Sequence, residues 1–132
     1  MIYYQIKNLP KIDIYAVKGS SYRKRWKVIY NDLPFPFFSA FDVLLWEFTF
    51  EVREHERDSS TILSLNSIDN AENIIVEKEL IDQEEYSYHG LYLTNLQTDI
   101  FSLGRKYYLI RLKRISDNWT FKLQKGNFEV IL

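Results

Sequence analysis

The sequence contains no cysteine, only four glycines and three prolines, and almost no excess of either charge. Without cysteine, neither disulfides nor thiolate metal sites can form. Glycines this few and this widely spread do not form a phosphate-binding loop. The 17 basic and 18 acidic residues nearly cancel, whereas a domain that holds a nucleic-acid backbone normally carries a basic excess. The charge balance therefore argues against nucleic acid as a partner.

Long apolar runs are also missing. No stretch approaches the roughly 20 residues that a membrane-spanning helix needs. The first residues lack the basic start and apolar stretch of a signal peptide. We therefore expect no membrane partner, and a protein that acts where it is made or within an assembly formed there.

Aromatic residues are abundant, at 17% of a 132-residue chain, and many of them alternate with polar residues. The clearest stretch is Val43–Arg53, where every second residue is large and apolar: Leu44, Trp46, Phe48, Phe50 and Val52. Alternation with period two is typical of a strand with one buried face. Such a face requires a second layer of structure over it.

Further segments that read as strands are separated by turn residues. They cover residues 12–17, 21–30, 61–66, 74–80, 86–93, 107–114, 119–123 and 128–132. Residues 81–85 read as an acidic loop, and residues 94–103 have room for one helical turn. Gly126 allows a bend or bulge in the last part of the chain.

This pattern predicts an all-β fold, an antiparallel β-sandwich of about eight strands with at most one short helix. The sandwich would be immunoglobulin-like or jelly-roll-like. With a 46% apolar composition, residues 1–132 are expected to form one domain with its own core. Residues 1–11 are either an edge strand or an arm that lies on a neighbour.

Few side chains are candidates for chemistry. His55 and His89 match no zinc spacing, and we interpret both as polar surface. Glu47 and Glu51 lie on the polar side of the central strand and are interpreted as a solvent face. We therefore predict no catalytic residue, no metal site and no cofactor.

The basic residues Arg23, Arg25 and Lys27 share one side of a predicted strand and are interpreted as a solvated face. Trp26 and Trp46 lie within apolar alternation and are expected in the core. Trp119 follows a turn and is the candidate for stacking against a sugar.

The loop of residues 31–42 carries more aromatic residues than a solvated loop tolerates. These side chains either fold back over the end of the sandwich or form an exposed patch that binds a partner. Together with the N-terminal arm they give the predicted partner interface: Tyr3, Tyr4, Phe35, Phe37 and Phe38.

Several turn and strand motifs follow one another in a recognisable order from residue 17 to residue 132. Lys18-Gly19-Ser20 opens a strand, and the proline-containing loop Pro34–Asp42 precedes the long central strand. Leu91–Thr94 and Leu103–Tyr108 follow, and the chain closes on the Gly-x-Phe-x-Val pattern of Gly126–Val130. This order resembles the N-terminal β-sandwich domain of phage baseplate upper proteins and related tail, neck and head appendage proteins.

The resemblance implies a non-enzymatic structural protein of a phage virion. It would be an adaptor or decoration β-sandwich of the tail, baseplate, neck or head that binds other virion structural proteins and forms a homo-oligomer within the assembly. The sequence departs from the family pattern at Ser20 and in the phenylalanine-rich residues Phe37–Phe41. The alternatives are a carbohydrate-binding module and a small protein that inhibits or regulates a host protein.

Overall fold

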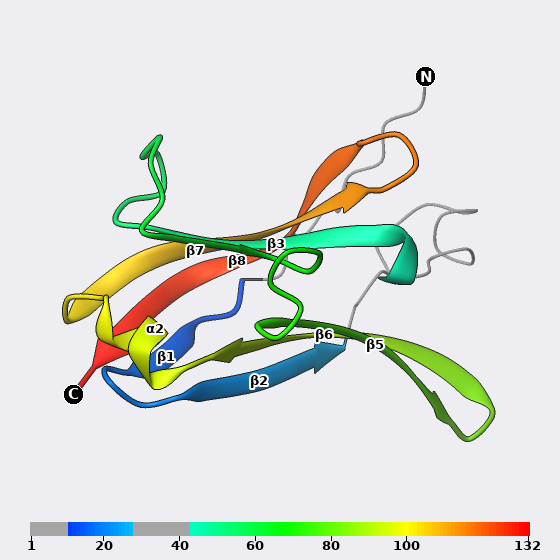
Figure 1. Ribbon diagram of the computed structural model, residues 1–132, viewed down its shortest axis with the longest axis horizontal. Helices are drawn as coiled ribbons and strands as arrows, with labels where there is room; N and C mark the ends of the chain where they lie inside the picture. The colour runs from blue at the N-terminus through cyan, green and yellow to red at the C-terminus, as the bar shows by residue number, and fades with distance from the viewer. Residues whose placement is uncertain (1–10, 28–42) are drawn as a thin grey trace.

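Two β-sheets of unequal size pack face to face in the computed structural model, which describes residues 11–27 and 43–132 (Figure 1). The larger sheet has five strands in the order β1-β8-β7-β3-β4, and the smaller has three in the order β2-β6-β5. The strands are β1 (Ile14–Val17), β2 (Tyr22–Lys27), β3 (Trp46–Arg53), β4 (Leu63–Asn66), β5 (Ile74–Ile81), β6 (Glu84–Leu93), β7 (Gly104–Arg114) and β8 (Thr120–Ile131). The helical elements are the 3-10 turn η1 (Val43–Leu45) and the short helix α2 (Asn95–Asp99). The predicted all-β sandwich of about eight strands is confirmed.

The central strand β3 alternates between the two faces of the larger sheet as its sequence predicts. Phe48, Phe50 and Val52 are fully buried, and the polar residues between them are only partly covered. The prediction is wrong for Leu44, which is 61% exposed. Residues 43–45 form η1, and a 3-10 turn does not continue the two-residue alternation of the strand.

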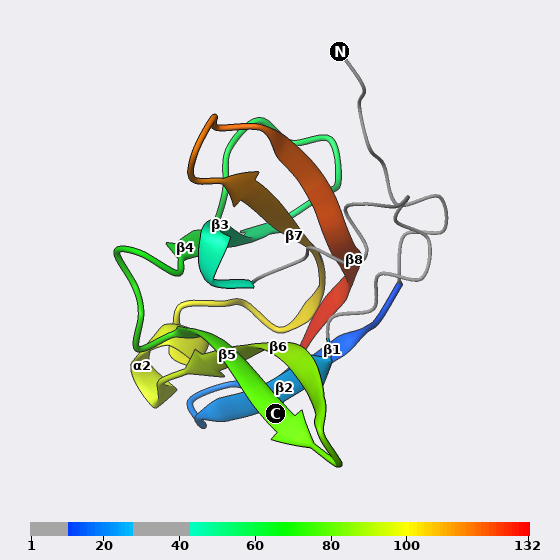
Figure 2. The same cartoon turned by 90° about the vertical axis from the view of Figure 1, so that its right-hand side faces the viewer.

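Among the described strands, every pairing is antiparallel except that of β1 with β8, which departs from the predicted antiparallel sandwich. β1 runs parallel to β8, with Ile14 opposite Phe128 and Val17 opposite Ile131. β1 and β2 are consecutive in the sequence but belong to different sheets, so the short turn between them carries the chain from one layer to the other (Figure 2).

The loop predicted at residues 81–85 is shorter than expected, and the bulge predicted at Gly126 lies elsewhere in β8. The predicted acidic loop at residues 81–85 is a two-residue turn at Asp82 and Gln83, which both have positive φ, and the strands continue on either side of it. The bulge in β8 lies at Leu123, because Ile110 pairs with Gln124 and Arg111 pairs with Lys122.

Gly126 is required by a close approach of the chain to itself. A Cβ at this position would lie 2.2 Å from the carbonyl oxygen of Ile12, where the chain enters β1. The Ile12 amide donates to the carbonyl oxygen of Lys125 at 2.9 Å, which holds the two segments together. Gly126 thus lets β1 reach its place at the edge of the larger sheet.

The core between the sheets is largely aromatic. Trp26 and Trp46 are buried, as predicted. Phe101 contacts Phe128 with ring centroids 4.9 Å apart, and Phe128 contacts Phe50 at 6.1 Å. Within the described residues, no helix has the length and apolar character to cross a membrane.

Gly126→Ala is expected to destabilise the fold by about 2 kcal/mol or more, because the new methyl group would meet backbone that cannot move without displacing β1. Gly90→Ala is the graded control, since its Cβ would lie 3.2 Å from the nearest backbone oxygen and needs a smaller adjustment. Urea denaturation of both variants measures the difference. Equal stability of Gly126→Ala and the parent chain would contradict the close approach.

Candidate functional site

The five residues of the predicted partner interface, namely Tyr3, Tyr4, Phe35, Phe37 and Phe38, lie outside the described residues. The N-terminal arm up to residue 10 lies outside them as well. Their role in binding therefore stays a prediction.

Trp119 is half-buried within an aromatic cluster at the end of the sandwich that carries the β7–β8 hairpin. Its ring lies 5.3 Å from Phe121 and 6.1 Å from Trp46, measured between centroids. The guanidinium of Arg114 sits 5.3 Å from the Trp119 ring, and the Trp119 amide donates to Asp117. The Arg114 ion pair holds the pKa of Asp117 down at about 2. The cluster anchors Trp119 in place, and its use for sugar stacking stays a prediction.

His89 is buried, and the prediction that it is polar surface is wrong. Its ring stacks on Phe48 of the opposite sheet with centroids 5.5 Å apart, and it contacts Trp26 at 5.4 Å. Burial lowers the pKa of His89 to about 4, and a hydrogen bond to the Gln124 side chain opposes this only in part. His89 is therefore a neutral core residue at pH 7. His55, by contrast, is exposed.

A short chain of buried polar groups links His89 to the start of β1. Gln124 bonds with His89 and donates its side-chain amide to the Tyr108 hydroxyl at 3.0 Å. The Tyr108 hydroxyl in turn donates to the carbonyl oxygen of Ile12. Burial raises the pKa of Tyr108 above its ordinary value, so the phenol remains a donor. These groups satisfy one another, as buried polar groups must.

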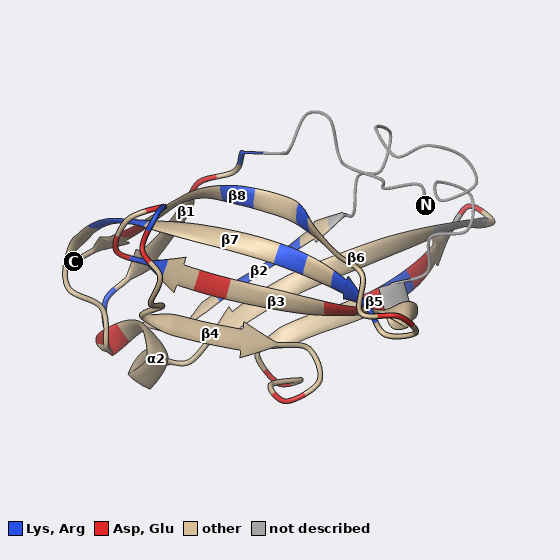
Figure 3. Cartoon of the chain, turned by 90° about the horizontal axis from the view of Figure 1, so that it is seen from above, with Lys and Arg blue, Asp and Glu red and all other residues tan. Residues whose placement is uncertain are grey.

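The acidic residues of β3 are paired with cations on the outer face of the larger sheet (Figure 3). Glu47 lies 3.2 Å from Lys113, and Glu51 lies 2.6 Å from Arg53. The side chains of Glu47 and Glu51 are 15% and 14% exposed. They are therefore more buried than the prediction of a solvent-exposed face implies. Among the described residues, no group of three or more side chains is placed to hold a metal ion.

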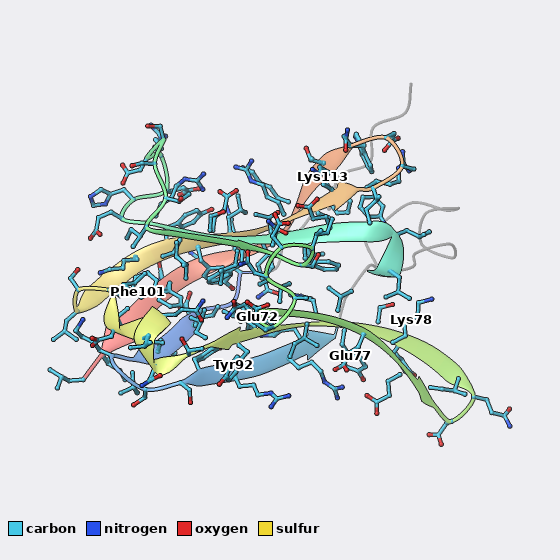
Figure 4. All side chains as sticks on the ribbon, viewed as in Figure 1. Glu72, Glu77, Lys78, Tyr92, Phe101 and Lys113 are labelled. Carbon is cyan, nitrogen blue, oxygen red and sulfur yellow. The ribbon has the colours of Figure 1, made fainter. Side chains whose placement is uncertain are left out.

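On the outer face of the smaller sheet, Arg23 and Arg25 are exposed, as predicted. Arg25 reaches across β6 to Glu77 at 2.9 Å and Glu79 at 3.0 Å, and Glu77 lies on the outer side of the sheet in Figure 4. Its guanidinium also covers the Tyr88 ring at 4.1 Å. Gly90, in register between Arg25 and Ile75, has no side chain to block this crossing. The two carboxylates offset the positive charge of Arg25.

Exposed apolar side chains gather where α2 and the ends of β1 and β8 meet. This surface, called here the α2 end, lies at the left of Figure 1 beside the C-terminus. Leu96 is 75% exposed and Ile100 is 54% exposed, and their spacing places them on one side of the helical turn. The exposed apolar residues assigned to the α2 end are Val17, Leu96, Ile100, Leu103, Ile131 and Leu132.

Hydrogen bonds hold α2 in an orientation that leaves these residues outside. Thr94 and Gln97 form a reciprocal capping box at its start. The buried Thr98 hydroxyl donates to the carbonyl oxygen of Ser20 at 2.7 Å. The Lys18 ammonium donates to the carbonyl oxygens of Asp99 at 2.5 Å and Phe101 at 2.6 Å. Gln97 and Thr98 of α2 are thereby bonded within the fold, and Leu96 and Ile100 are left to solvent.

Sequence reasoning placed a helical turn within residues 94–103 but did not identify Leu96, Ile100 and Leu103 as surface. The Thr-x-x-Gln capping box at residue 94 and the four-residue spacing of Leu96 and Ile100 were the available signals. They show that the helix begins at Asn95, but not which of its sides the sandwich covers.

Comparison of the chain with family models gave no match, and comparison with curated proteins gave none either. The resemblance to phage baseplate domains therefore stays a prediction.

Acidification is expected to destabilise the fold through His89. The unfolded side chain takes up a proton near pH 6.5, but the buried ring does so only near pH 4. The unfolded state therefore binds more protons between these values, and the free energy of unfolding falls as the pH drops through this window. A loss of about 2 kcal/mol between pH 7 and pH 5 is expected, measurable by urea denaturation at each pH.

His89→Phe should lose most of this pH dependence, because the variant has no group that titrates at that position. His55→Ala is the matched control and should keep it, because His55 is exposed. An unchanged pH profile in His89→Phe would show that another group is responsible.

Proposed function

We propose that this protein is a non-enzymatic adaptor that binds neighbouring protein subunits, and specifically a structural protein of a phage virion. The observation that carries the binding role is the exposed apolar surface of the α2 end. Exposed apolar side chains that gather at one end of a domain typically mark a site of protein contact. The assignment to a phage particle rests on the sequence resemblance described above.

The architecture suits an adaptor in two ways. The side chains that hold α2 in place, Lys18, Thr94 and Thr98, bond within the fold, so the patch is presented by a preformed surface. A preformed surface loses less conformational entropy when it binds. The predicted interface residues Tyr3, Tyr4, Phe35, Phe37 and Phe38 would add further apolar contacts to the partner.

The test is affinity capture of the tagged protein from cells that produce it in its native context, with mass spectrometry of the bound proteins. Recovery of portal, tail or capsid subunits is the expected result. Recovery of a single host enzyme would favour an inhibitor or regulator and would overturn the virion assignment.

Leu96→Asp combined with Ile100→Asp is expected to abolish capture of the virion subunits and to leave folding intact, because both side chains are exposed. Leu80→Asp combined with Ile115→Asp is the matched control, since these side chains are as apolar and exposed but lie near the β5–β6 turn and in the β7–β8 hairpin, at the end of the sandwich opposite α2 in Figure 1. Thermal denaturation checks the folding of both variants. Normal capture by the α2 variant would contradict the role of this surface.

Phe37→Asp combined with Phe38→Asp tests the predicted loop interface. The expected result is a folded protein with weakened capture, measured in the same assay. Unfolding of the monomer would instead place these two aromatic residues in the core.

A further inference from the structure

A small cavity lies between the two sheets, beside the buried His89. It has room for the centre of one water-sized sphere, about 10 Å³, which is the least space in which a protein holds a water molecule. Side chains of both sheets line it, among them Trp26 of β2 and His89 of β6 from the smaller sheet, and Phe48 of β3 and Ile110 of β7 from the larger one. The volume limits an occupant to about the size of water, and that occupant would touch both layers of the sandwich.

The indole N–H of Trp26 is a buried donor without an acceptor. Trp26 is 8% exposed, and its Nε1 makes no hydrogen bond within the part of the chain that the structure describes. The other buried side-chain atom without a hydrogen bond among these residues is Oε2 of Glu51, which has the Arg53 guanidinium at 2.6 Å. A buried indole N–H usually has a partner, because an unpaired donor loses its bond to water and gains nothing in return. Trp26 therefore requires an acceptor inside the core.

Most groups around the cavity cannot be this acceptor. Five of the lining side chains offer only hydrocarbon: Phe48, Phe50, Ile74, Leu91 and Ile110. Thr49 and Gly90 belong to strands that pair on both sides, so their main-chain groups bond within the sheets, and the Thr49 side chain points to the outer face. The face of the His89 ring is not an acceptor either, because the two ring planes are inclined by only 31° and an indole N–H lies in the plane of its own ring.

His89 has a second ring nitrogen that can accept a hydrogen bond. Its bond with the Gln124 side chain raises the pKa of the ring against the effect of burial, and a bond that favours the protonated ring is one in which the ring donates. The Gln124 oxygen is then the acceptor, while the Gln124 amide nitrogen donates onward to the Tyr108 hydroxyl. A neutral imidazole has a single N–H, so its other nitrogen keeps a lone pair. A donor and an acceptor thus belong to two residues that line the same cavity.

From the cavity, the buried indole N–H and the imidazole lone pair together, we propose that one water molecule is bound between the sheets. It accepts a hydrogen bond from Trp26 Nε1 and donates one to the unprotonated nitrogen of His89. An ion of either sign would lie unpaired among hydrocarbon groups, whereas water satisfies both residues. A continuous hydrogen-bonded chain then crosses the core from Trp26 to the Ile12 carbonyl, through His89, Gln124 and Tyr108. This inference goes beyond the proposed function and does not depend on it.

The first test is a crystal structure of the full chain at a resolution that shows ordered water. One water is expected within about 3 Å of both Trp26 Nε1 and a ring nitrogen of His89. An empty cavity, or a direct hydrogen bond between the two rings, would overturn the proposal.

Nuclear Overhauser measurements between water and the isotope-labelled protein test the same contact in solution. The indole proton of Trp26, assigned by its loss in Trp26→Phe, should give a cross-peak with the sign of a water that stays bound for longer than the protein tumbles. Tyr108→Phe is the control, because a hydroxyl proton that exchanges with solvent could give a false cross-peak. The cross-peak should persist in Tyr108→Phe. Its loss there, or its absence in the parent chain, would overturn the bound water.

The nitrogen chemical shifts of His89 test the second half of the bridge. At pH 7 a single neutral tautomer is expected, with one nitrogen protonated and the other at the shift of a hydrogen-bond acceptor. Trp26→Phe removes the donor that holds the water, so it should move the second nitrogen toward the shift of a free lone pair. The exposed His55 is the internal control and should not respond. An unchanged shift at His89 would show that its ring takes no part in the bridge and would overturn the proposed site.

Discussion

The stacking of His89 on Phe48 joins the two sheets within the core. It connects the middle strand of the smaller sheet to a central strand of the larger one, with Trp26 against the histidine ring. An imidazole can serve as an aromatic core residue only while it is neutral, because a buried charge without a partner is costly. Gln124 supplies a hydrogen bond to the ring. The core thus accepts a polar side chain at the cost of acid sensitivity.

The hydrogen-bonded polar groups that begin at His89 also connect the core to β1 at the edge of the larger sheet. Gln124 and Tyr108 carry the hydrogen bonding from His89 to the Ile12 carbonyl, and Gly126 leaves the space in which Ile12 passes. β1 is only four residues long and pairs on one side, so its ladder to β8 alone would hold it weakly. Tyr108 and Gly126 fix the point where β1 begins. A short edge strand is thereby kept in a defined position.

The local sequence pattern predicted most of the strands. The errors occur where contacts between residues far apart in the sequence determine the structure. Alternation identified β3 because its two faces differ sharply in polarity. It misjudged His89 because β6 carries large side chains on both faces. One face of β6 carries Tyr86, Tyr88 and Tyr92, and the other carries Leu91 and Leu93. Both faces look apolar in the sequence, yet the leucines face the core. The parallel pairing of β1 with β8 joins residues more than a hundred positions apart, and no local signal specifies it.

The α2 end and the β1 edge meet at Val17 and Ile131, and this adjacency bears on how a partner would be recognised. Lys18 follows Val17 directly and bonds to the end of α2, so the last position of β1 lies beside the exposed apolar helix. A partner that covers the exposed apolar residues of the α2 end would therefore also contact the end of β1.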